Sequence, residues 1–571
     1  MDSKRKKSGP PRLFSQWRTK ALFIVFLLVS AVILNRLYSL QIIQGDYYSA
    51  LARGKDVKIE DVPPRGNIYF QDKAGEGRFL AATNKEVPLV YANPKNIDDE
   101  EHVLNTLAGI IDIEQEKDTI LARLLDKTRS YALIKRNLSE HEAGIITELE
   151  LEGVYVKYES VRIYPAEAVG SHVLGFLGFS GDKRIGQYGA EEFHENTLSG
   201  NSSGTFSLEG LFSNSIFNDS PSDVELSIDY GIQFVVEKKL AETVERLGAA
   251  SGTAIFMDPK TGAIISMANF PEFNPNTYNE VEDISIFDNP AVQGTYEPGS
   301  AFKPITVAAG LDAGVITPQT TYDDTGKVHI GGYTIENFDK KSRGQQTMTQ
   351  ALENSLNTGM VFIQQSLGKK KFREYVEAFQ MDNYTGIDLP GEDKGSMANI
   401  KNTNIDINYA TASFGQGLSL TPLRLLTAIS AIANNGVMMK PYITEKIKKG
   451  PLEIVTKPEE IARPISSVTA SKVTAMMVST VKNGYDKKVS VPGYTLAGKT
   501  GTAQVPNEDG SGYSDKTIHT FVGFAPAYDP KFVGIIRMDG VKGINFASDS
   551  IAPLFGDIAS FVLQYYQIPP Q

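Results

Sequence analysis

Ser300 and Lys303 are the two residues whose types and spacing most directly suggest covalent chemistry. They follow the turn-forming pair Pro298-Gly299 and open an apolar segment that predicts a helix. Residues three apart share one helix face, so the Lys303 ammonium can lie beside the Ser300 hydroxyl. Burial lowers the pKa of a lysine, and its neutral amine can then activate a serine nucleophile. Ser-x-x-Lys alone is common by chance, so this pair needs support from elsewhere in the chain.

The segment Lys499-Thr500-Gly501-Thr502 has two interpretations. With Gly493 it satisfies the phosphate-binding pattern G-x-x-x-x-G-K-[ST], which requires a helix to begin at the lysine. The residues from Gly501 to Pro506 cannot readily begin a helix, so we reject nucleotide binding. In a strand, residues two apart face the same side, and the hydroxyls of Thr500 and Thr502 are then presented together.

The segment Ser355-Leu356-Asn357 lies between these two patterns, 55 residues after Ser300 and 144 residues before Lys499. The patterns Ser-x-x-Lys, Ser-x-Asn and Lys-Thr-Gly therefore occur in one chain, in that order. Their joint occurrence indicates serine acylation chemistry more strongly than any one of them does.

Two other patterns suggest chemistry but are better explained otherwise. Gly200-Asn201-Ser202-Ser203-Gly204 fits G-x-S-x-G, yet neither the strand before it nor the helix after it that this motif needs is evident. We interpret it as a flexible Gly/Ser linker. The six histidines are scattered and none forms a close metal-binding pair. His519 lies nearest the catalytic patterns, and we expect it to be structural.

Strand and helix patterns predict the elements that position these residues. Strand-like segments occur at 224–229, 253–258, 263–268, 517–525 and 531–538, and helical ones at 99–125, 230–247 and 551–566. A turn at Pro259-Lys260-Thr261-Gly262 makes a hairpin of the second and third strands. Strands at both ends with helices between them predict an α+β domain built on an antiparallel sheet.

Composition limits the possible functions. The chain has 571 residues, enough for two or three domains, and a net charge of −11. Basic residues are concentrated in the N-terminal tail, and the rest of the chain is acidic. An acidic body argues against the binding of nucleic acid through a basic face. Zero cysteines exclude disulfides, thiolate metal sites and a cysteine nucleophile.

The N-terminus predicts a membrane anchor. A basic tail at 1–20 precedes fourteen positions, 21–34, of which only Ser30 is polar. A helix over 21–43 would span a bilayer, with Arg36 extending toward the headgroups. A cleaved signal peptide is the alternative, but the bulky Asn35-Arg36-Leu37-Tyr38 stands where a small-residue cleavage site belongs. We expect the basic tail to be cytoplasmic, with a domain at 44–223 and a second at 224–571 outside the membrane.

The ordered motifs make the chain resemble a class B penicillin-binding protein, the membrane-anchored peptidoglycan D,D-transpeptidase of bacterial cell walls. Segments that look like the family's N-terminal pedestal (dimerisation) domain are Arg65-Gly66-Asn67-Ile68, Arg162-Ile-Tyr-Pro165 and Gly186-Gln-Tyr-Gly189-Ala-Glu191. Tyr91-Ala-Asn-Pro-Lys95 and the pedestal length are more similar to the division-type, FtsI-like branch than to the elongation type. The resemblance implies a serine β-lactamase-like catalytic fold.

The resemblance also implies a role for each motif residue. Ser300 would attack the D-Ala-D-Ala carbonyl of a stem peptide, Lys303 would be its base and Ser355 would relay a proton to the departing D-alanine. Asn357 would hold the donor amide, while the strand Lys499-Thr500-Gly501-Thr502 would receive the terminal carboxylate. Backbone N–H groups of Ser300 and Thr502 would form the oxyanion hole. No cofactor or metal is implied.

The implied partners are peptidoglycan stem peptides, β-lactam antibiotics as inhibitors, the membrane, and a SEDS-family glycosyltransferase with other divisome or elongasome proteins. Two alternatives remain open. A membrane-bound serine β-lactamase or β-lactam sensor would share the three motifs, but no glutamate is clearly placed to activate a deacylating water. A catalytically silent division scaffold would tolerate loss of Ser300, Lys303 or Lys499, yet all three are present.

Overall fold

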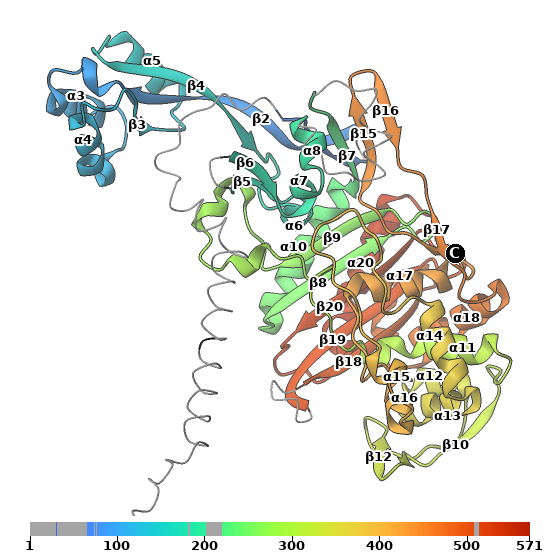
Figure 1. Ribbon diagram of the computed structural model, residues 1–571. Coiled ribbons are helices and arrows are strands. Elements are labelled where there is room, and N and C mark those ends of the chain that lie inside the picture. Colours follow the sequence, from blue (N-terminus) through green and yellow to red (C-terminus); the bar gives the residue numbers. More distant parts are fainter. Residues whose placement is uncertain are drawn as a thin grey trace, which may run out of the picture. The chain divides into compact units, whose positions relative to one another are not determined.

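Figure 1 shows the protein as a computed structural model. It describes residues 65–73, 75, 77–180, 183–200, 220–506 and 513–570, together with the single residue 30. The described residues form two compact units. The smaller unit holds those within 89–157 and 178–185, and the larger unit holds the others from 65 onward.

The smaller unit contains short helices and strand segments, and both β3 and β4 (Val154–Ile163) pair with β2. The sequence predicts one helical region over 99–125, and the structure forms two α-helices there, the first of which ends at Ala108 with Gly109 as its C-cap. Asp99 caps the first of them through its side chain, which accepts a hydrogen bond from the N–H of His102. The last residues of β2 pair with β3. The elements are β2 (Gly77–Ala92, shared with the larger unit), η2 (Pro94–Asn96), α3 (Glu100–Ala108), η3 (Glu114–Glu116), α4 (Lys117–Leu125), β3 (Ala132–Lys135) and α5 (Glu140–Glu148).

In the larger unit, the first described strand lies between the strand that follows it in the sequence and a strand about 150 residues further along the chain. β1 (Ile68–Asp72) pairs antiparallel with the start of β2 and parallel with β7 (Asp223–Asp229). β7 in turn pairs with β15 (Thr444–Lys449). The predicted strand at 224–229 therefore joins the N-terminal segment to a hairpin of the C-terminal half.

The predicted antiparallel sheet is the centre of the larger unit. Its strands follow the order β18-β19-β20-β8-β9, and every neighbouring pair is antiparallel. The expected hairpin forms from β8 and β9, and the two expected C-terminal strands are β19 and β20. The five strands are β8 (Ser251–Met257), β9 (Ile264–Phe270), β18 (Ala497–Pro506), β19 (Tyr513–Ala525) and β20 (Phe532–Asp539).

Helices cover both faces of this sheet (Figure 1). One face contributes Ala254 and Phe256 to an apolar core shared with α10 (Tyr230–Leu247) and α20 (Ala552–Tyr565). The alternate residues Ile255 and Met257 are also buried but lie outside that core, so the opposite face is covered too. Every residue of α17 (Pro422–Ala433) is buried, and this helix contacts β8, β19 and β20. A further long helix, α18 (Ser467–Asn483), packs on β18.

Short elements connect these layers. β4 (Val154–Ile163), β5 (Phe176–Ser180) and β6 (Lys183–Gln187) contain residues of both units. The others, all in the larger unit, are α6 (Ser171–Leu174), α7 (Gly189–Phe193), α8 (Glu195–Ser199), η4 (Pro275–Glu280), η5 (Ile284–Phe287), η6 (Gly299–Phe302), α11 (Lys303–Asp312), β10 (Thr321–Asp324), β11 (Lys327–Ile330), β12 (Tyr333–Glu336), β13 (Gly344–Thr347), α12 (Met348–Glu353), α13 (Asn357–Leu367), α14 (Lys369–Ala378), α15 (Ala398–Lys401), α16 (Asp406–Ala412), β14 (Met438–Met439), β16 (Leu452–Val455), β17 (Glu460–Ala462), η7 (Lys487–Val489) and α19 (Ala547–Ser550).

Two sequence predictions fall mainly outside the described residues. These are the membrane anchor at 21–43 and the Gly/Ser segment that follows Gly200. Among the residues that the structure does describe, no helix combines the length and the apolar character needed to cross a bilayer.

Candidate active site

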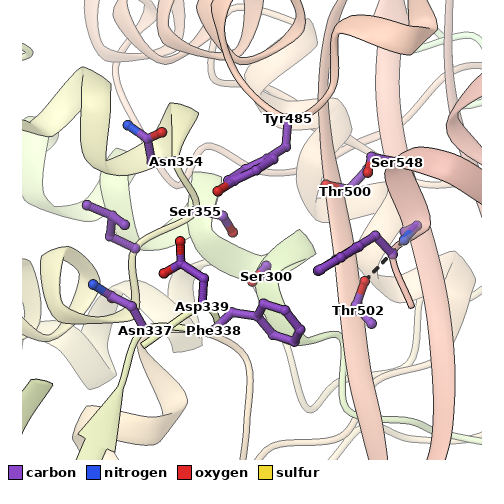
Figure 2. Close-up of a pocket in the computed structure, with 13 residues that line it drawn as sticks. Ser300, Asn337, Phe338, Asp339, Asn354, Ser355, Tyr485, Thr500, Thr502 and Ser548 are labelled. Atoms are coloured by element: carbon purple, nitrogen blue, oxygen red, sulfur yellow. Dashed lines mark hydrogen bonds between the residues drawn. The ribbon is translucent and has the colours of Figure 1, made fainter. Parts of the chain in front are cut away.

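Three segments that are far apart in the sequence meet at one pocket of the larger unit. Ser300 lies in the short turn η6, which leads directly into α11. It lines the pocket with Ser355, which follows α12, and with Thr500 and Thr502 of β18. Figure 2 shows Ser300 between Ser355 on one side and the two threonines on the other. The structure thus brings together the serine, relay and strand motifs found in the sequence.

Lys303 is completely buried at the start of α11 and binds the second motif. Its Nζ lies 2.5 Å from the backbone oxygen of Ser355, 3.1 Å from Ser355 Oγ and 2.8 Å from Asn357 Oδ1. Burial, and next the charge of Lys499, hold the pKa of Lys303 well below its ordinary value. A lysine whose pKa falls in this way can act as a neutral base.

The Ser300 hydroxyl makes no hydrogen bond with the described part of the chain, whereas Lys303 contacts three polar atoms of the second motif. Lys303 follows Ser300 by three residues along continuous helical backbone. The amine is therefore fixed by its contacts with Ser355 and Asn357, and the Ser300 hydroxyl faces the pocket without a partner in the described chain.

Ser355 has a backbone conformation that non-glycine residues rarely adopt. Its φ of +52° lies in the left-handed region, in the turn between α12 and α13. Such strain persists only where the surroundings hold it, and it is frequent at functional sites. Here the turn directs both the backbone oxygen and Oγ of Ser355 to Lys303. Asn357 completes the turn and is also held on its other side, because its Nδ2 donates to the backbone oxygen of Glu336.

The strand interpretation of the third motif is correct, since residues 499–502 lie within β18. Gly501 lets this strand approach the turn that contains Ser300. A Cβ at this position would lie 2.8 Å from the backbone oxygen of Pro298 and 2.9 Å from the backbone nitrogen of Ala301. Thr502 Oγ1 accepts a hydrogen bond from the N–H of Ala547 at 3.2 Å, so its own proton is free for a ligand.

Lys499 is 1% exposed and has a partner that the sequence did not reveal. Asp486, also 1% exposed, lies 3.8 Å from it, and accepts a hydrogen bond from the Thr500 hydroxyl at 2.5 Å. Burial lowers the pKa of Lys499, while the Asp486 carboxylate raises it. Asp486 follows Gly484-Tyr485 and precedes two lysines, a pattern typical of a polar surface turn. Nothing in that pattern marks it as part of a site.

Aromatic and polar side chains form the outer walls of the pocket. Phe338 and Phe546 meet edge to face with ring centroids 4.9 Å apart. Arg343 holds Asp339 by an ion pair of 2.7 Å and donates a hydrogen bond of 3.3 Å to the Tyr485 hydroxyl. The loop after β12 thereby contacts Phe546 on one side of the pocket and Tyr485 on another. Sequence reasoning missed these residues, because exposed aromatics without a motif give no specific signal.

His519, the histidine nearest the motifs, is buried in β19 beside Thr502. Its Nδ1 is 2.7 Å from Ser550 Oγ, and burial lowers its pKa to about 4. It is neutral at physiological pH and helps to fix α19, whose first two residues line the pocket. The structural role expected from the sequence fits this position.

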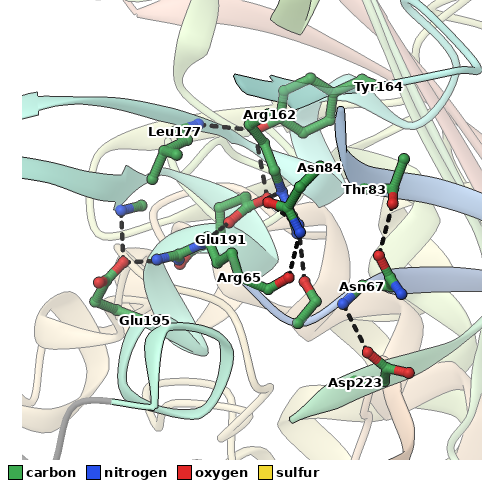
Figure 3. Close-up of polar contacts among 12 residues, drawn as sticks. Arg65, Asn67, Thr83, Asn84, Arg162, Tyr164, Leu177, Glu191, Glu195 and Asp223 are labelled. Atoms are coloured by element: carbon green, nitrogen blue, oxygen red, sulfur yellow. Dashed lines mark hydrogen bonds and ion pairs between the residues drawn. The ribbon is translucent and has the colours of Figure 1, made fainter. Parts of the chain in front are cut away.

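The pedestal-like segments meet at a second buried cluster, also within the larger unit (Figure 3). Arg65 Nε and Arg162 Nε lie 2.8 Å and 2.7 Å from the two oxygens of Glu191. Tyr164 donates a hydrogen bond of 3.3 Å to the same carboxylate, and Arg65 also binds Glu195 at 2.7 Å. Burial alone would raise the pKa of Glu191, but the two arginines lower it. This cluster joins three segments through fixed charges.

The pocket combines a serine with a nearby buried lysine, and comparisons with known proteins identify the family of the chain. The penicillin-binding protein transpeptidase domain matches residues 252–560, and the penicillin-binding protein dimerisation domain matches residues 60–207. The chain belongs to this family of class B penicillin-binding proteins.

Relatives and solved structures agree with this assignment. Stage V sporulation protein D of Bacillus subtilis is 31% identical over 97% of this chain and 87% of its own length. Peptidoglycan D,D-transpeptidase FtsI of Escherichia coli is 28% identical over 98% of this chain and 93% of its own. Penicillin binding protein 3 of Mycobacterium tuberculosis, solved with aztreonam, is 29% identical with a TM-score of 0.64, covering 72% of this chain and 92% of its own. Such relatives support the FtsI-like branch suggested by the sequence.

Proposed function

We propose that the protein cross-links peptidoglycan stem peptides as a D,D-transpeptidase in which Ser300 is the nucleophile and Lys303 is its base. The observation that carries this proposal is a buried lysine with a strongly lowered pKa, held by Ser355 and Asn357 one helical turn from a serine in the pocket. Membership of the family is consistent with the same chemistry.

Acylation follows from these contacts. Ser300 Oγ attacks the carbonyl carbon between the two terminal D-alanines, and its proton passes to the neutral amine of Lys303. The C–N bond then breaks, and the departing D-alanine nitrogen needs a proton. Ser355 can supply it from its hydroxyl, and Lys303, whose Nζ is 3.1 Å from Ser355 Oγ, passes the proton taken from Ser300 on to Ser355. Lys303 is then neutral again. The products are free D-alanine and an ester on Ser300.

The negative oxygen formed during attack needs donors that are already in place. We assign this role to the backbone N–H groups of Ser300 and Thr502, since β18 lies directly against η6. In a well-studied protease one such donor contributes about 3 to 4 kcal/mol to the transition state. An amine of a second stem peptide next attacks the ester, forms the new amide and frees Ser300.

A β-lactamase is the second candidate, because the pocket does contain a carboxylate. Among the described lining residues it is Asp339, which Arg343 binds through both carboxylate oxygens. The Arg343 hydrogen bonds, with only a smaller opposing effect of burial, lower the pKa of Asp339. A carboxylate whose pKa is lowered is a weak general base for water. We therefore favour the transpeptidase over rapid hydrolysis of the acyl-enzyme.

The location and partners of the protein belong to the same proposal. The apolar segment at 21–43 anchors the chain in the cytoplasmic membrane, with the basic tail at 1–20 inside and the pedestal and catalytic domains outside. A SEDS-family glycosyltransferase and other division proteins are the proposed partners. Protease added to intact spheroplasts should digest all but the first forty or so residues. Protection of the C-terminal half would exclude this topology.

The nucleophile is tested by covalent labelling with fluorescent penicillin. Ser300→Ala should abolish the labelled band without unfolding the protein. The matched control is Ser202→Ala, which removes the serine of the alternative G-x-S-x-G pattern and should leave labelling intact. Persistent labelling of the Ser300 variant would reject the assignment.

A further inference from the structure

Asp486 places a carboxylate beside the strand segment 499–502, which the family resemblance assigns to the substrate carboxylate. It lies in the turn between α18 and η7, 3.8 Å from the Lys499 ammonium. The oxygen nearest Lys499 is Oδ2, and it also accepts a hydrogen bond of 3.4 Å from the N–H of Thr500. The other oxygen, Oδ1, accepts a hydrogen bond of 2.5 Å from the Thr500 hydroxyl. Because Asp486 and Lys499 are both 1% exposed, water screens their interaction poorly.

The two threonines of the strand motif therefore have different roles. A hydroxyl has one proton, and Thr500 donates its proton to Asp486. Thr500 cannot donate the same proton to a substrate carboxylate. Thr502 accepts from the N–H of Ala547 and keeps its proton for a ligand in the pocket. The hydroxyl that contacts a substrate carboxylate is thus the one on Thr502.

The charge of Lys499 also depends on Asp486. A fully buried ammonium tends to lose its proton unless a partner compensates for lost hydration. The charged neighbours of Lys499 in the described chain are Asp486 from the turn after α18 and Lys303 from α11. The lysines of α18 at positions 472 and 482 are exposed, and the neutral His519 of β19 is bonded to Ser550.

On the basis of the transpeptidase function, we propose that Asp486 is the positioning residue of the carboxylate subsite. It keeps Lys499 charged and fixes the Thr500 hydroxyl, so that Lys499 and Thr502 receive the substrate carboxylate. The retained charge on Lys499 then disfavours a second charge on Lys303, which remains a neutral base. Through its charge, Asp486 thus favours the protonated form of Lys499 and, indirectly, the neutral form of Lys303.

The test compares Asp486→Asn with the wild-type protein in acylation by benzylpenicillin and by its methyl ester, which lacks the carboxylate. The second-order rate constants are measured from about pH 6 to about pH 10. Without its counterion, Lys499 should lose its proton about 1 to 3 pH units earlier. The preference for the acid over the ester should therefore disappear at correspondingly lower pH in the variant.

Two control variants separate this role from a general loss of charge. Asp549→Asn removes an exposed carboxylate of α19 that pairs with Lys488, and it should keep the wild-type profile. Asp486→Glu retains the negative charge and should restore the preference at alkaline pH. A profile of Asp486→Asn that matches the wild type would overturn the proposal. So would a higher acid preference at every pH, because Asp486 would then compete with the substrate, or an equal loss for acid and ester.

A second pair of variants keeps the proposal testable if Asp486→Asn does not fold. Thr502→Val should slow acylation by the acid by about tenfold or more, because a hydrogen bond to a charged group is lost. Thr500→Val should have a clearly smaller effect. Equal losses in the two variants would contradict the assignment. The transpeptidase function is judged separately, by whether labelling depends on Ser300.

Discussion

Two buried charge clusters of the larger unit are built on opposite principles. The pedestal cluster surrounds one carboxylate, Glu191, with two arginines and a tyrosine hydroxyl. The active-site cluster has two lysines, Lys303 and Lys499, and one neighbouring carboxylate, Asp486. The acceptors that bind Lys303 are all uncharged.

The difference shows how the same burial gives a structural cluster in one place and a reactive one in the other. Arginine keeps its proton when buried, and the neighbouring carboxylates raise the pKa of Arg65 despite the opposing effect of burial. Lysine loses its proton more readily, and burial lowers the pKa of both Lys303 and Lys499. Fixed charges hold segments together, whereas a lysine without a counterion can accept a proton.

The largest expected effect comes from making the active-site cluster resemble the pedestal cluster. Lys303→Arg keeps a positive charge but removes the neutral base. Acylation by penicillin should fall by about 10² to 10⁴-fold, the usual contribution of a general base. Lys303→Met removes the amine altogether and is the matched variant. Thermal unfolding should show both variants folded, and a near wild-type acylation rate in either one would refute Lys303 as the base.

A substitution in the pedestal cluster should lower the free energy of unfolding and leave the acylation rate of Ser300 unchanged. Glu191→Gln removes the buried carboxylate that pairs with Arg162 and leaves Arg65 with Glu195 alone. Breaking a buried ion pair in this way typically costs about 3 to 5 kcal/mol. Denaturant unfolding should report this loss, while the folded fraction should still acylate Ser300 at the wild-type rate. A variant of unchanged stability would mean that the cluster carries no structural role.

In the wild-type protein, acid pH should reduce the acylation rate and the stability over different pH ranges, because the two clusters titrate differently. Acylation should decrease by about tenfold per pH unit once Lys303 is protonated. Glu191 behaves differently, because its pKa is lower in the folded state than in the unfolded chain. Its contribution to stability is present above the unfolded pKa and is lost as pH falls through the folded pKa. A pH range should exist in which the protein is folded but slow to acylate, and parallel rate and unfolding measurements would find it.

The smallest effect is expected at an exposed ion pair. Lys260 and Asp529 lie 2.6 Å apart, and both side chains are more than half exposed. Hydrogen bonds from Lys260 and Lys531 lower the pKa of Asp529 to about 2. Solvent screens such pairs, so Lys260→Met should change the free energy of unfolding by less than about 1 kcal/mol. A loss comparable to that of Glu191→Gln would contradict the importance we give to burial.

The sequence predicted most of the scaffold because its signals are local. The helix over 230–247 and the hairpin of β8 and β9 follow from apolar periodicity and turn residues. The three motifs could be found because each is short and their order is specific. The predicted helical region over 99–125 is two helices in the structure. The apolar periodicity of the sequence did not show that α3 ends before Gly109.

The features that the sequence did not reveal depend on tertiary contacts. Asp486 and Lys499 are thirteen residues apart and meet only because a turn folds back on β18. The left-handed backbone of Ser355 has no sequence marker, because serine rarely adopts it. Likewise, Phe338 and Phe546 are distant in the chain and give no pattern, although they meet at the pocket.

The central claim is that Ser300 forms an acyl-enzyme that water removes slowly. The most direct measurement follows penicillin loss at several enzyme concentrations, together with the intact mass of the protein and peptide mapping. Consumption should stop near one equivalent per enzyme, with a persistent adduct mapped to Ser300, because hydrolysis lacks a base contribution of about 10² to 10⁴-fold. Turnover of many equivalents with little adduct, or an adduct on another residue, would contradict the account.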